Sequence, residues 1–251
     1  MNITEKALQN KEKFLPFYES ELDSTDPEFM EIFNNFLFDE VQSNTNLSDK
    51  NKILVVLATL ITNQSHKEYE IALEAAINTG LKATEIKEVL YQSAPYVGFS
   101  KAYDFLDITN QLFDEKGIDV PLPGQATTTR KNRKEKGLEI QYEFFGKEMI
   151  QQMIDNAPDN QQHFNEFLKG YCFGDFYTRT SLNNQERELI TFSILASLGG
   201  CENQLRGHIV GNLNVGNNQD TLIDALTVLM PFIGFPRTLN ALALINEICN
   251  E

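Results

Sequence analysis

Four polar side chains in the second half of the chain have types and spacing suited to chemistry. Cys201, Gln204 and His208 recur at i, i+3 and i+7, which places them on one face of a helix. Glu188 lies on the preceding predicted helix, and an antiparallel helix pair would bring its carboxylate near that face. A carboxylate fixes the tautomer of an imidazole, and the imidazole transfers protons near neutral pH. The spacing therefore predicts a proton-transfer site at Glu188 and His208, with Cys201 as a nearby thiol.

The same residue types also have an ordinary structural interpretation. A lone histidine on a helix is more often a surface residue or a hydrogen-bonded structural residue than a catalytic one. A lone cysteine is more often a small buried apolar filler. Spacing alone therefore leaves both interpretations of His208 and Cys201 open.

The elements that position these residues are predicted to be helices. In the second half, Asn183 is an N-cap with Glu186 three residues on, a capping-box pattern ahead of a broad apolar run over 189–198. The glycines at 199 and 200 end this helix. Further helices are predicted over 202–214, over 220–230 with a stop at Pro231, and from Pro236 to 249. The first half repeats the pattern over 49–61, 66–78, 84–93 and 100–114.

The two halves are copies of one another. The segment 77–80 (INTG) matches 213–216 (LNVG), and 95–99 (PYVGF) matches 231–235 (PFIGF), each 136 residues apart. Upstream the separation is 135, so one residue was gained or lost between about 51 and 65. A period this long indicates a duplicated domain rather than a solenoid repeat. We expect a first repeat over 1–118, a linker over 119–139 containing the basic stretch 130–134, and a second repeat over 140–251.

The polar set is present in one copy and missing in the other. Ala72 matches His208, Ser65 matches Cys201, and either Lys52 or Ile53 matches Glu188, depending on where the gap lies. His66 is one residue out of register and is not expected to be functional. The first repeat is therefore predicted to be structural, with the possibility that it supplies one wall of the site. Three aromatic residues at helix ends are candidates to line apolar pockets, although most such residues are core: Tyr96, Phe232 and Phe235.

Composition narrows the class of protein. The net charge of −15 over 251 residues argues against nucleic-acid binding, which needs a basic face, and gives no reason to expect a membrane partner. The N-terminus lacks the apolar core of a signal peptide, and the longest apolar run, 53–61, is too short to span a bilayer. Three cysteines without a Cys-x-x-Cys pair make a disulfide framework unexpected. We predict a cytoplasmic protein with a small-molecule substrate and with neither a metal nor a cofactor.

Several motifs occur together in order: 174–179 (GDFYTR), 185–189 (QEREL), 195–200 (LASLGG), 204–208 (QLRGH) and 212–216 (NLNVG). With these motifs the chain resembles the carboxymuconolactone decarboxylase family, closely over 164–248 and as a more divergent copy over 29–114. The resemblance implies an all-α fold made of two alkylhydroperoxidase D-like helical units. It also implies a homotrimer that imitates a hexamer of single-copy chains.

The resemblance assigns roles position by position. Glu188 matches the family's acidic site residue, His208 its site histidine, and Arg206 the arginine just before it. Cys201 matches the first cysteine of the Cys-x-x-Cys-x-x-x-His motif of peroxidase-type members, but Gln204 occupies the second cysteine position. Without that resolving thiol, a disulfide cycle cannot run within the motif. Arg206 and Gln204 are candidates for substrate binding, although Arg206 lies about 200° around the helix from His208.

Three functions remain open from the sequence. The leading hypothesis is an enzyme that uses Glu188 and His208 for proton transfer on a small organic acid or lactone, as in lactone decarboxylation. The alternative is a thiol-dependent peroxidase (peroxiredoxin activity) acting through Cys201. The third is a non-catalytic oligomeric binding module, which the loss of the site in the first copy makes conceivable.

Overall fold

The computed structural model of the protein describes residues 2–16 and 18–249, and within these residues it contains helices and no strand. The elements of the first repeat are α1 (Glu5–Phe14), α2 (Leu22–Thr25), α3 (Pro27–Asn35), the π-helical η1 (Phe36–Val41), α4 (Asp49–Asn63), α5 (His66–Asn78), α6 (Ala83–Val97) and α7 (Phe99–Glu115). Those of the second are α8 (Arg133–Phe145), α9 (Lys147–Asp155), η2 (Asp159–Gln161), α10 (Gln162–Phe167), the π-helical η3 (Leu168–Tyr177), α11 (Asn184–Leu198), α12 (Glu202–Asn214) and α13 (Gln219–Cys249). The all-α, two-repeat fold expected from the sequence is confirmed.

The turn that joins α4 to α5 in the first repeat, and α11 to α12 in the second, fixes the register of the two repeats. Helices α4 and α11 both contain 15 residues and are 135 positions apart, whereas α5 and α12 both contain 13 and are 136 apart. In the first repeat the turn is Gln64, held in the left-handed region at φ 59°, followed by Ser65. In the second repeat it contains Gly199, Gly200 and Cys201, so the extra residue lies in this turn. The residue that matches Glu188 is therefore Ile53.

Local signals explain why these helices begin where they do. The side chain of Ser48 accepts a hydrogen bond from the backbone nitrogen of Asn51 at the start of α4. At the start of α11, Asn183 and Glu186 form a reciprocal capping box, each side chain bonded to the other's backbone nitrogen. Such caps satisfy backbone donors that have no partner within the helix. The predicted capping box is confirmed.

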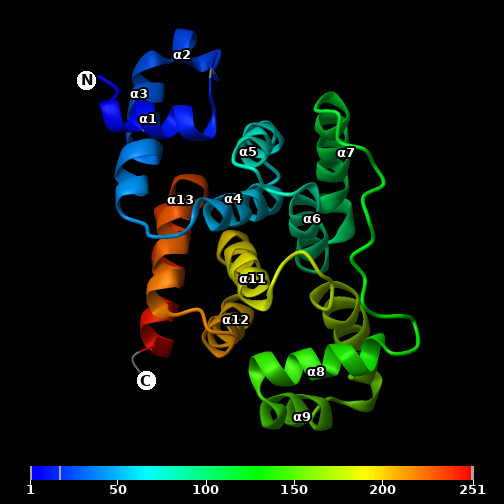
Figure 1. The fold of residues 1–251 in the computed structure, drawn as a ribbon. Coiled ribbons are helices and arrows are strands. Elements are labelled where there is room, and N and C mark those ends of the chain that lie inside the picture. The colour runs from blue at the N-terminus through cyan, green and yellow to red at the C-terminus, as the bar shows by residue number, and fades with distance from the viewer. Residues whose placement is uncertain (1, 17, 250–251) are drawn as a thin grey trace.

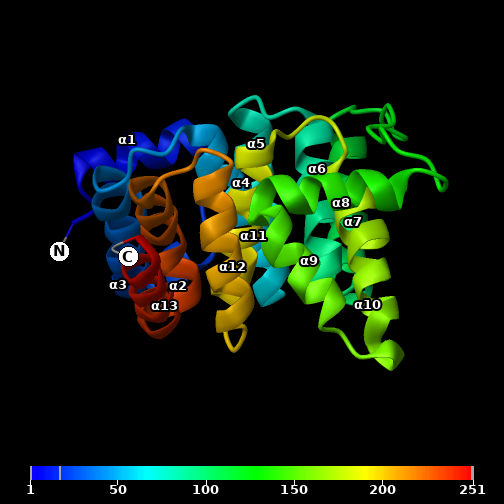
Figure 2. The ribbon, with the colours of Figure 1, turned by 90° about the horizontal axis from the view of Figure 1, so that it is seen from below.

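The two repeats exchange their peripheral helices. Helices α4 and α11 lie side by side at the centre (Figure 1). Helix α13 of the second repeat packs on α4 and η1, while α6 of the first repeat packs on α11 and η3. Consequently α8 and α9 lie at the opposite end of the molecule from α1, α3 and α13 (Figures 1 and 2). Each repeat thus packs against a helix of the other repeat, so a site in one repeat is lined partly by a helix of the other.

One predicted boundary was wrong. The helix expected to stop at Pro231 continues to Gly234, where φ is 75°, just as α6 runs past Pro95 and ends at Gly98, where φ is 88°. In both helices the helical backbone continues past the proline, and the helical dihedral angles end at the glycine, whose positive φ is not helical. The segment labelled α13 therefore consists of two helices joined at a kink.

Two apolar helices, α13 and α11, bear on the expectations about a membrane and about a subunit interface. By length and composition α13 is long and apolar enough to cross a membrane, but the kink divides it, and its buried residues belong to the core shared with α4, α11 and α12. Helix α11, expected from its apolar run to form a subunit interface, is instead buried inside a single chain. Its composition needs no second subunit, so the trimer stays a prediction. The extended segment between the repeats ends where α8 begins, at Arg133, within the stretch 119–139 expected to be linker.

Candidate active site

Helices α11 and α12 bring Glu188 and His208 together. Nδ1 of His208 lies 2.9 Å from Oε2 and 3.2 Å from Oε1 of Glu188, whose side chain is completely buried. An ionised carboxylate can only accept hydrogen bonds, so Nδ1 carries the hydrogen. The second ring nitrogen, Nε2, has no hydrogen-bond partner among the residues that the structure describes. The expected hydrogen bond is present, and it leaves Nε2 available for proton exchange.

Close packing holds the Glu188 carboxylate in place. A Cβ atom at Gly211, on α12, would lie only 2.5 Å from Oε2 of Glu188, so a larger residue there would displace the carboxylate. The side chain of Asn212 donates to the backbone oxygens of Glu188 and His208, at 3.0 and 2.7 Å. Helices α11 and α12 are thus locked together at the level of the pair.

A chain of hydroxyl groups continues from the carboxylate. The Tyr177 hydroxyl donates to Oε1 of Glu188 at 3.0 Å and lies 2.7 Å from the Thr191 hydroxyl. The side chain of Gln92 donates to Thr191 at 3.2 Å. Since Tyr177 gives its only hydrogen to Glu188, Thr191 must donate to Tyr177. The buried carboxylate therefore accepts from two side chains, which offsets the cost of burying its charge.

The first repeat supplies part of this site. The hydroxyl of Tyr96, on α6, lies 2.6 Å from that of Tyr177, and its ring meets the His208 ring edge to face at 5.7 Å. Phe145, at the end of α8, also packs edge to face against the imidazole, with ring centroids 5.2 Å apart. Burial raises the pKa of Tyr96 and Tyr177 well above that of an ordinary tyrosine, with a further rise from the Glu188 charge. Both phenols therefore stay protonated and serve as hydrogen-bond donors.

A buried ion pair joins the two repeats next to the site. The Arg187 guanidinium, completely buried, donates to Glu88 at 3.0 Å and to Gln92 at 2.9 Å. Arg179 donates to both oxygens of Glu88, at 2.9 and 3.1 Å. Burial lowers the pKa of Arg187, while the charge of Glu88 raises it. Through Gln92 and Thr191, the Arg187–Glu88 ion pair is connected to the hydrogen-bond chain that ends on Glu188.

The structure separates Cys201 from the Glu188–His208 pair. Its sulfur lies 3.4 Å from the backbone oxygen of Leu195 and packs against the apolar cluster of α11, α12 and α13. Within the described residues it has no recorded contact with Glu188 or His208. Burial, and secondly the charge of Glu202, raise the pKa of the Cys201 thiol. The shared pocket expected from the i, i+7 spacing therefore lacks this contact, because two helical turns span about 10 Å.

The two candidate substrate-binding residues lie outside the buried pair. Arg206 forms a two-pronged ion pair with Glu247 of α13, at 2.6 and 2.7 Å, on the face of α12 away from His208. Arg206 therefore points away from His208, as its angle of about 200° around the helix predicted, and it pairs with a residue of the same chain. Gln204 is exposed one turn before His208. A Cβ at Gly207 would meet nothing within 4 Å, so the surface of α12 next to His208 is open.

Several site residues were not identified from the sequence, above all Tyr177, Thr191, Gln92 and Cys172. Burial raises the pKa of the Cys172 thiol to about 12, and its sulfur lies 4.0 Å from the Tyr96 hydroxyl, beside the site. A signal was available in the first repeat: Glu88, Gln92 and Tyr96 recur every four residues on one face of α6. Polar residues at that spacing on a buried helix indicate a buried network.

The first repeat has no comparable polar set. At the matching positions it carries Ile53 for Glu188, Ala72 for His208, Val56 for Thr191 and Gln42 for Tyr177. His66, one residue out of register, is exposed, lies 3.7 Å from Asp104 and stacks on Phe105. The loss expected from the sequence is thus accompanied by loss of the surrounding network.

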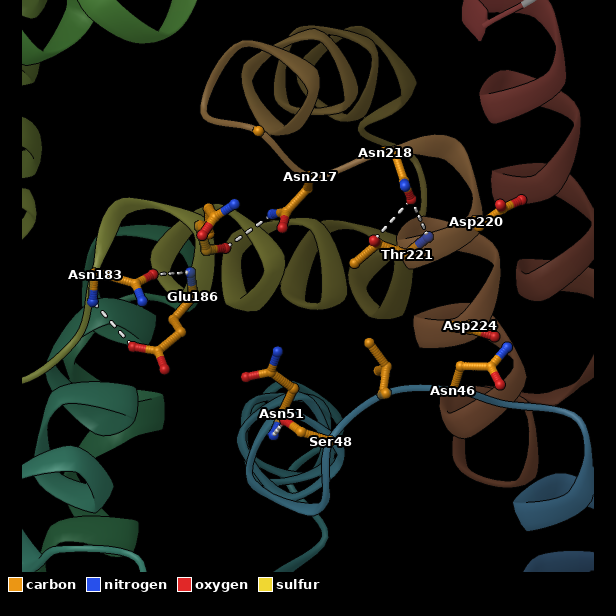
Figure 3. A pocket seen from close by; sticks show the side chains of 13 residues that line it. Asn46, Ser48, Asn51, Asn183, Glu186, Asn217, Asn218, Asp220, Thr221 and Asp224 are labelled. Atoms are coloured by element: carbon orange, nitrogen blue, oxygen red, sulfur yellow. Dashed lines mark hydrogen bonds between the residues drawn. The ribbon is translucent and has the colours of Figure 1, made fainter.

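A polar cleft of about 530 Å³ lies elsewhere, where the starts of α4, α11 and α13 meet (Figure 3). Its side chains mostly cap helices: Asn183 with Glu186, Asn218 with Thr221, and Asn217 on the backbone oxygen of Gln185. These groups already have partners, and the cleft contains neither Glu188 nor His208. We therefore assign it a structural role.

Comparison with known proteins identifies the family of the chain. The carboxymuconolactone decarboxylase family matches the chain twice, over residues 27–111 and 162–247. A 4-carboxymuconolactone decarboxylase of Acinetobacter baylyi is 27% identical over 119 residues, which are 47% of this chain and 88% of the relative. A solved structure from Burkholderia xenovorans LB400, described as a candidate gamma-carboxymuconolactone decarboxylase subunit, covers 96% of both chains with a TM-score of 0.58 at 18% identity, which supports the fold. The chain therefore belongs to the carboxymuconolactone decarboxylase family, as a member with two copies of the domain.

Proposed function

We propose that the protein is a decarboxylase-like enzyme in which Glu188 and His208 transfer a proton on a small organic acid or lactone. The observation that carries the proposal is the buried hydrogen bond from Nδ1 of His208 to Glu188, which directs Nε2 away from the carboxylate. The Glu188 carboxylate accepts the Nδ1 hydrogen and fixes the tautomer and orientation of the ring. The family relationship supplies the class of reaction.

The reaction assigned to the pair is protonation after loss of CO₂. The bond between the ring carbon and the substrate carboxylate breaks, CO₂ leaves, and the electron pair moves into the conjugated lactone as a dienolate. The Nε2 hydrogen of the His208 imidazolium is then transferred to carbon, and a proton from solvent restores the imidazolium. General acid catalysis of this kind contributes about 10²–10⁴-fold to a rate.

The peroxidase alternative receives less support. A peroxidatic cysteine must be an accessible thiolate, favoured by a nearby cation. Burial raises the pKa of both Cys201 and Cys172, and an acidic side chain, Glu202, adds to the effect at Cys201. Both environments favour the neutral thiol.

The test is an assay for CO₂ release from 4-carboxymuconolactone, the substrate in the name of the Acinetobacter relative. We expect turnover by the native protein and a loss of about 10²–10⁴-fold in kcat for His208→Ala and Glu188→Gln. His66→Ala is the matched control, since His66 is exposed and lies outside the site; it should retain full activity. Native activity unchanged by His208→Ala would refute the role of the pair, and an inactive native protein would refute the substrate.

A further inference from the structure

The first repeat contains a large apolar pocket. It has a volume of about 550 Å³, within the usual range for small-molecule sites, and is walled by α1, α3, η1, α4, α5 and α13. Its lining is rich in aromatic side chains, among them Phe14, Phe33, Phe38 and Phe232. Figure 1 shows α1, α3 and α13 on the side of the molecule away from α8 and α9, with α4 and α5 nearer its centre.

This pocket occupies the position in the first repeat that the Glu188–His208 site occupies in the second. Its lining includes Ile53, Ala72 and Val56, the counterparts of Glu188, His208 and Thr191. Phe232 from α13 replaces Tyr96 from α6, so the wall from the opposite repeat is also preserved. Large-to-small replacement at position 72, together with loss of the polar network, leaves an apolar cavity where the other repeat has its proton-transfer pair.

Two polar groups in this pocket lack adequate partners. The side chain of Asn34 is 1% exposed, and its Nδ2 is buried without a hydrogen-bond partner. Nζ of Lys52, with a side chain 13% exposed, donates to the neutral Gln42 at 2.9 Å. Its nearest carboxylate, Asp49, is 3.9 Å away and is bound more closely by Lys13, at 2.5 Å. A buried donor without a partner is costly, and an ammonium whose nearest carboxylate lies 3.9 Å away can still bind a closer anion, so both groups favour an additional acceptor atom.

Most of the charged side chains that line the pocket are positive, which also favours an anionic ligand. Although the protein has a net charge of −15, the pocket is lined by three lysines, Lys11, Lys52 and Lys67, and one acidic residue, Glu68. Burial lowers the pKa of Lys52, and this effect outweighs the opposing influence of the carboxylates of Asp49 and Asp224. The lining thus combines a wide apolar wall with donors that an anionic oxygen would satisfy.

We infer that this pocket is a second ligand site, which binds an amphipathic monocarboxylate of the fatty-acid type. The apolar chain lies against the phenylalanine side chains and fills the space above Ala72. The carboxylate accepts from Lys52 and from Nδ2 of Asn34. The site is non-catalytic and independent of the function proposed for Glu188 and His208.

The test is calorimetric titration of the full-length protein with decanoate, and with 1-decanol as the neutral analogue. We expect saturable 1:1 binding of decanoate and at least tenfold weaker binding of decanol. Lys52→Met should weaken decanoate binding at least tenfold and leave decanol binding unchanged. Ala72→Phe should weaken binding of both at least tenfold, because its ring occupies part of the cavity.

Two controls keep the result unambiguous. His208→Ala should bind decanoate as the native protein does, which separates this pocket from the proton-transfer site. Ala75→Leu, a smaller obstruction that faces the same cavity, replaces Ala72→Phe if circular dichroism shows that variant to be unfolded. Absence of saturable decanoate binding, binding that survives the folded obstruction, or binding lost in His208→Ala would each overturn the inference.

Discussion

The two repeats of this chain place the same helices in the same register around different interiors. In the second repeat, Glu188 and His208 lie in a hydrogen-bond network that includes Tyr177, Thr191 and Gln92. In the first, the matching positions Ile53 and Ala72 line an apolar cavity. The backbone framework, including the exchange of α6 and α13 between repeats, is common to both. The framework therefore positions a site, and a small number of side chains decides whether that site is polar or apolar.

The comparison also shows what the first repeat contributes to the site in the second. Tyr96 contacts the His208 ring, and Gln92 donates to Thr191, so the site in the second repeat depends on a helix of the first. Arg187 is buried only because Glu88 pairs with it from that same helix. The first repeat, which lacks counterparts of Glu188 and His208, thus still supplies a wall of the site in the second.

The largest expected effect on stability tests this dependence. Glu88→Ala removes the partner of a completely buried guanidinium, and breaking a buried ion pair costs about 3–5 kcal/mol. Urea unfolding of the variant should show a lower midpoint with an unchanged slope. The matched control is Asp224→Ala, at the corresponding position on α13, where no ion pair is recorded in the described part of the chain. It should cost about 1 kcal/mol or less. Equal losses in the two variants would show that the repeats do not differ in this way.

Much of the fold was predictable because its signals are local. Apolar periodicity, the Asn183–Glu186 capping box and the terminal glycines gave the central helices to within a few residues. The helices before position 49, and α8 to α10, were not assigned from the sequence, although Thr4 caps α1. The stop at Pro231 was wrong because the turn depends on the positive φ of Gly234, three residues later. These local patterns therefore predicted where the central helices lie more accurately than where each helix ends.

The site was predictable only in part. The Glu188–His208 pair followed from motif and helix spacing, since both residues lie in one repeat. Tyr96 and Gln92 are separated from the pair by about a hundred residues, and their contacts arise from the exchange of α6 between repeats. The i, i+7 relation places Cys201 and His208 on one helix face but leaves them two turns apart, so the role of Cys201 stays a prediction.

A change at Gly211 tests how closely the Glu188 carboxylate is held. Gly211→Ala places a methyl group where a Cβ would lie 2.5 Å from Oε2 of Glu188, so the carboxylate must move away from His208. We expect kcat to fall about 10–100-fold, less than on removal of the acid itself, because a misplaced acid loses most of its contribution. The reverse change in the first repeat, Ala75→Gly, should cost about 1 kcal/mol of helix stability and leave kcat unchanged. Full activity in Gly211→Ala would mean that the contact is not required.

The smallest effect is expected at the remaining difference between the copies, Cys201 against Ser65. Cys201→Ser makes the second turn chemically like the first, and we expect decarboxylase activity to stay within about twofold, because the sulfur contacts the Leu195 backbone and not His208. Alkylation by iodoacetamide checks the state of the thiol. Burial raises its pKa, so the thiolate fraction at pH 7.5 is below that of an ordinary cysteine. The rate should start low and increase until the pH exceeds that raised pKa, a profile displaced to higher pH than that of free glutathione. A rate at pH 7.5 above that of glutathione, together with loss of peroxide turnover in Cys201→Ser, would instead make the thiol the reactive group of the second repeat.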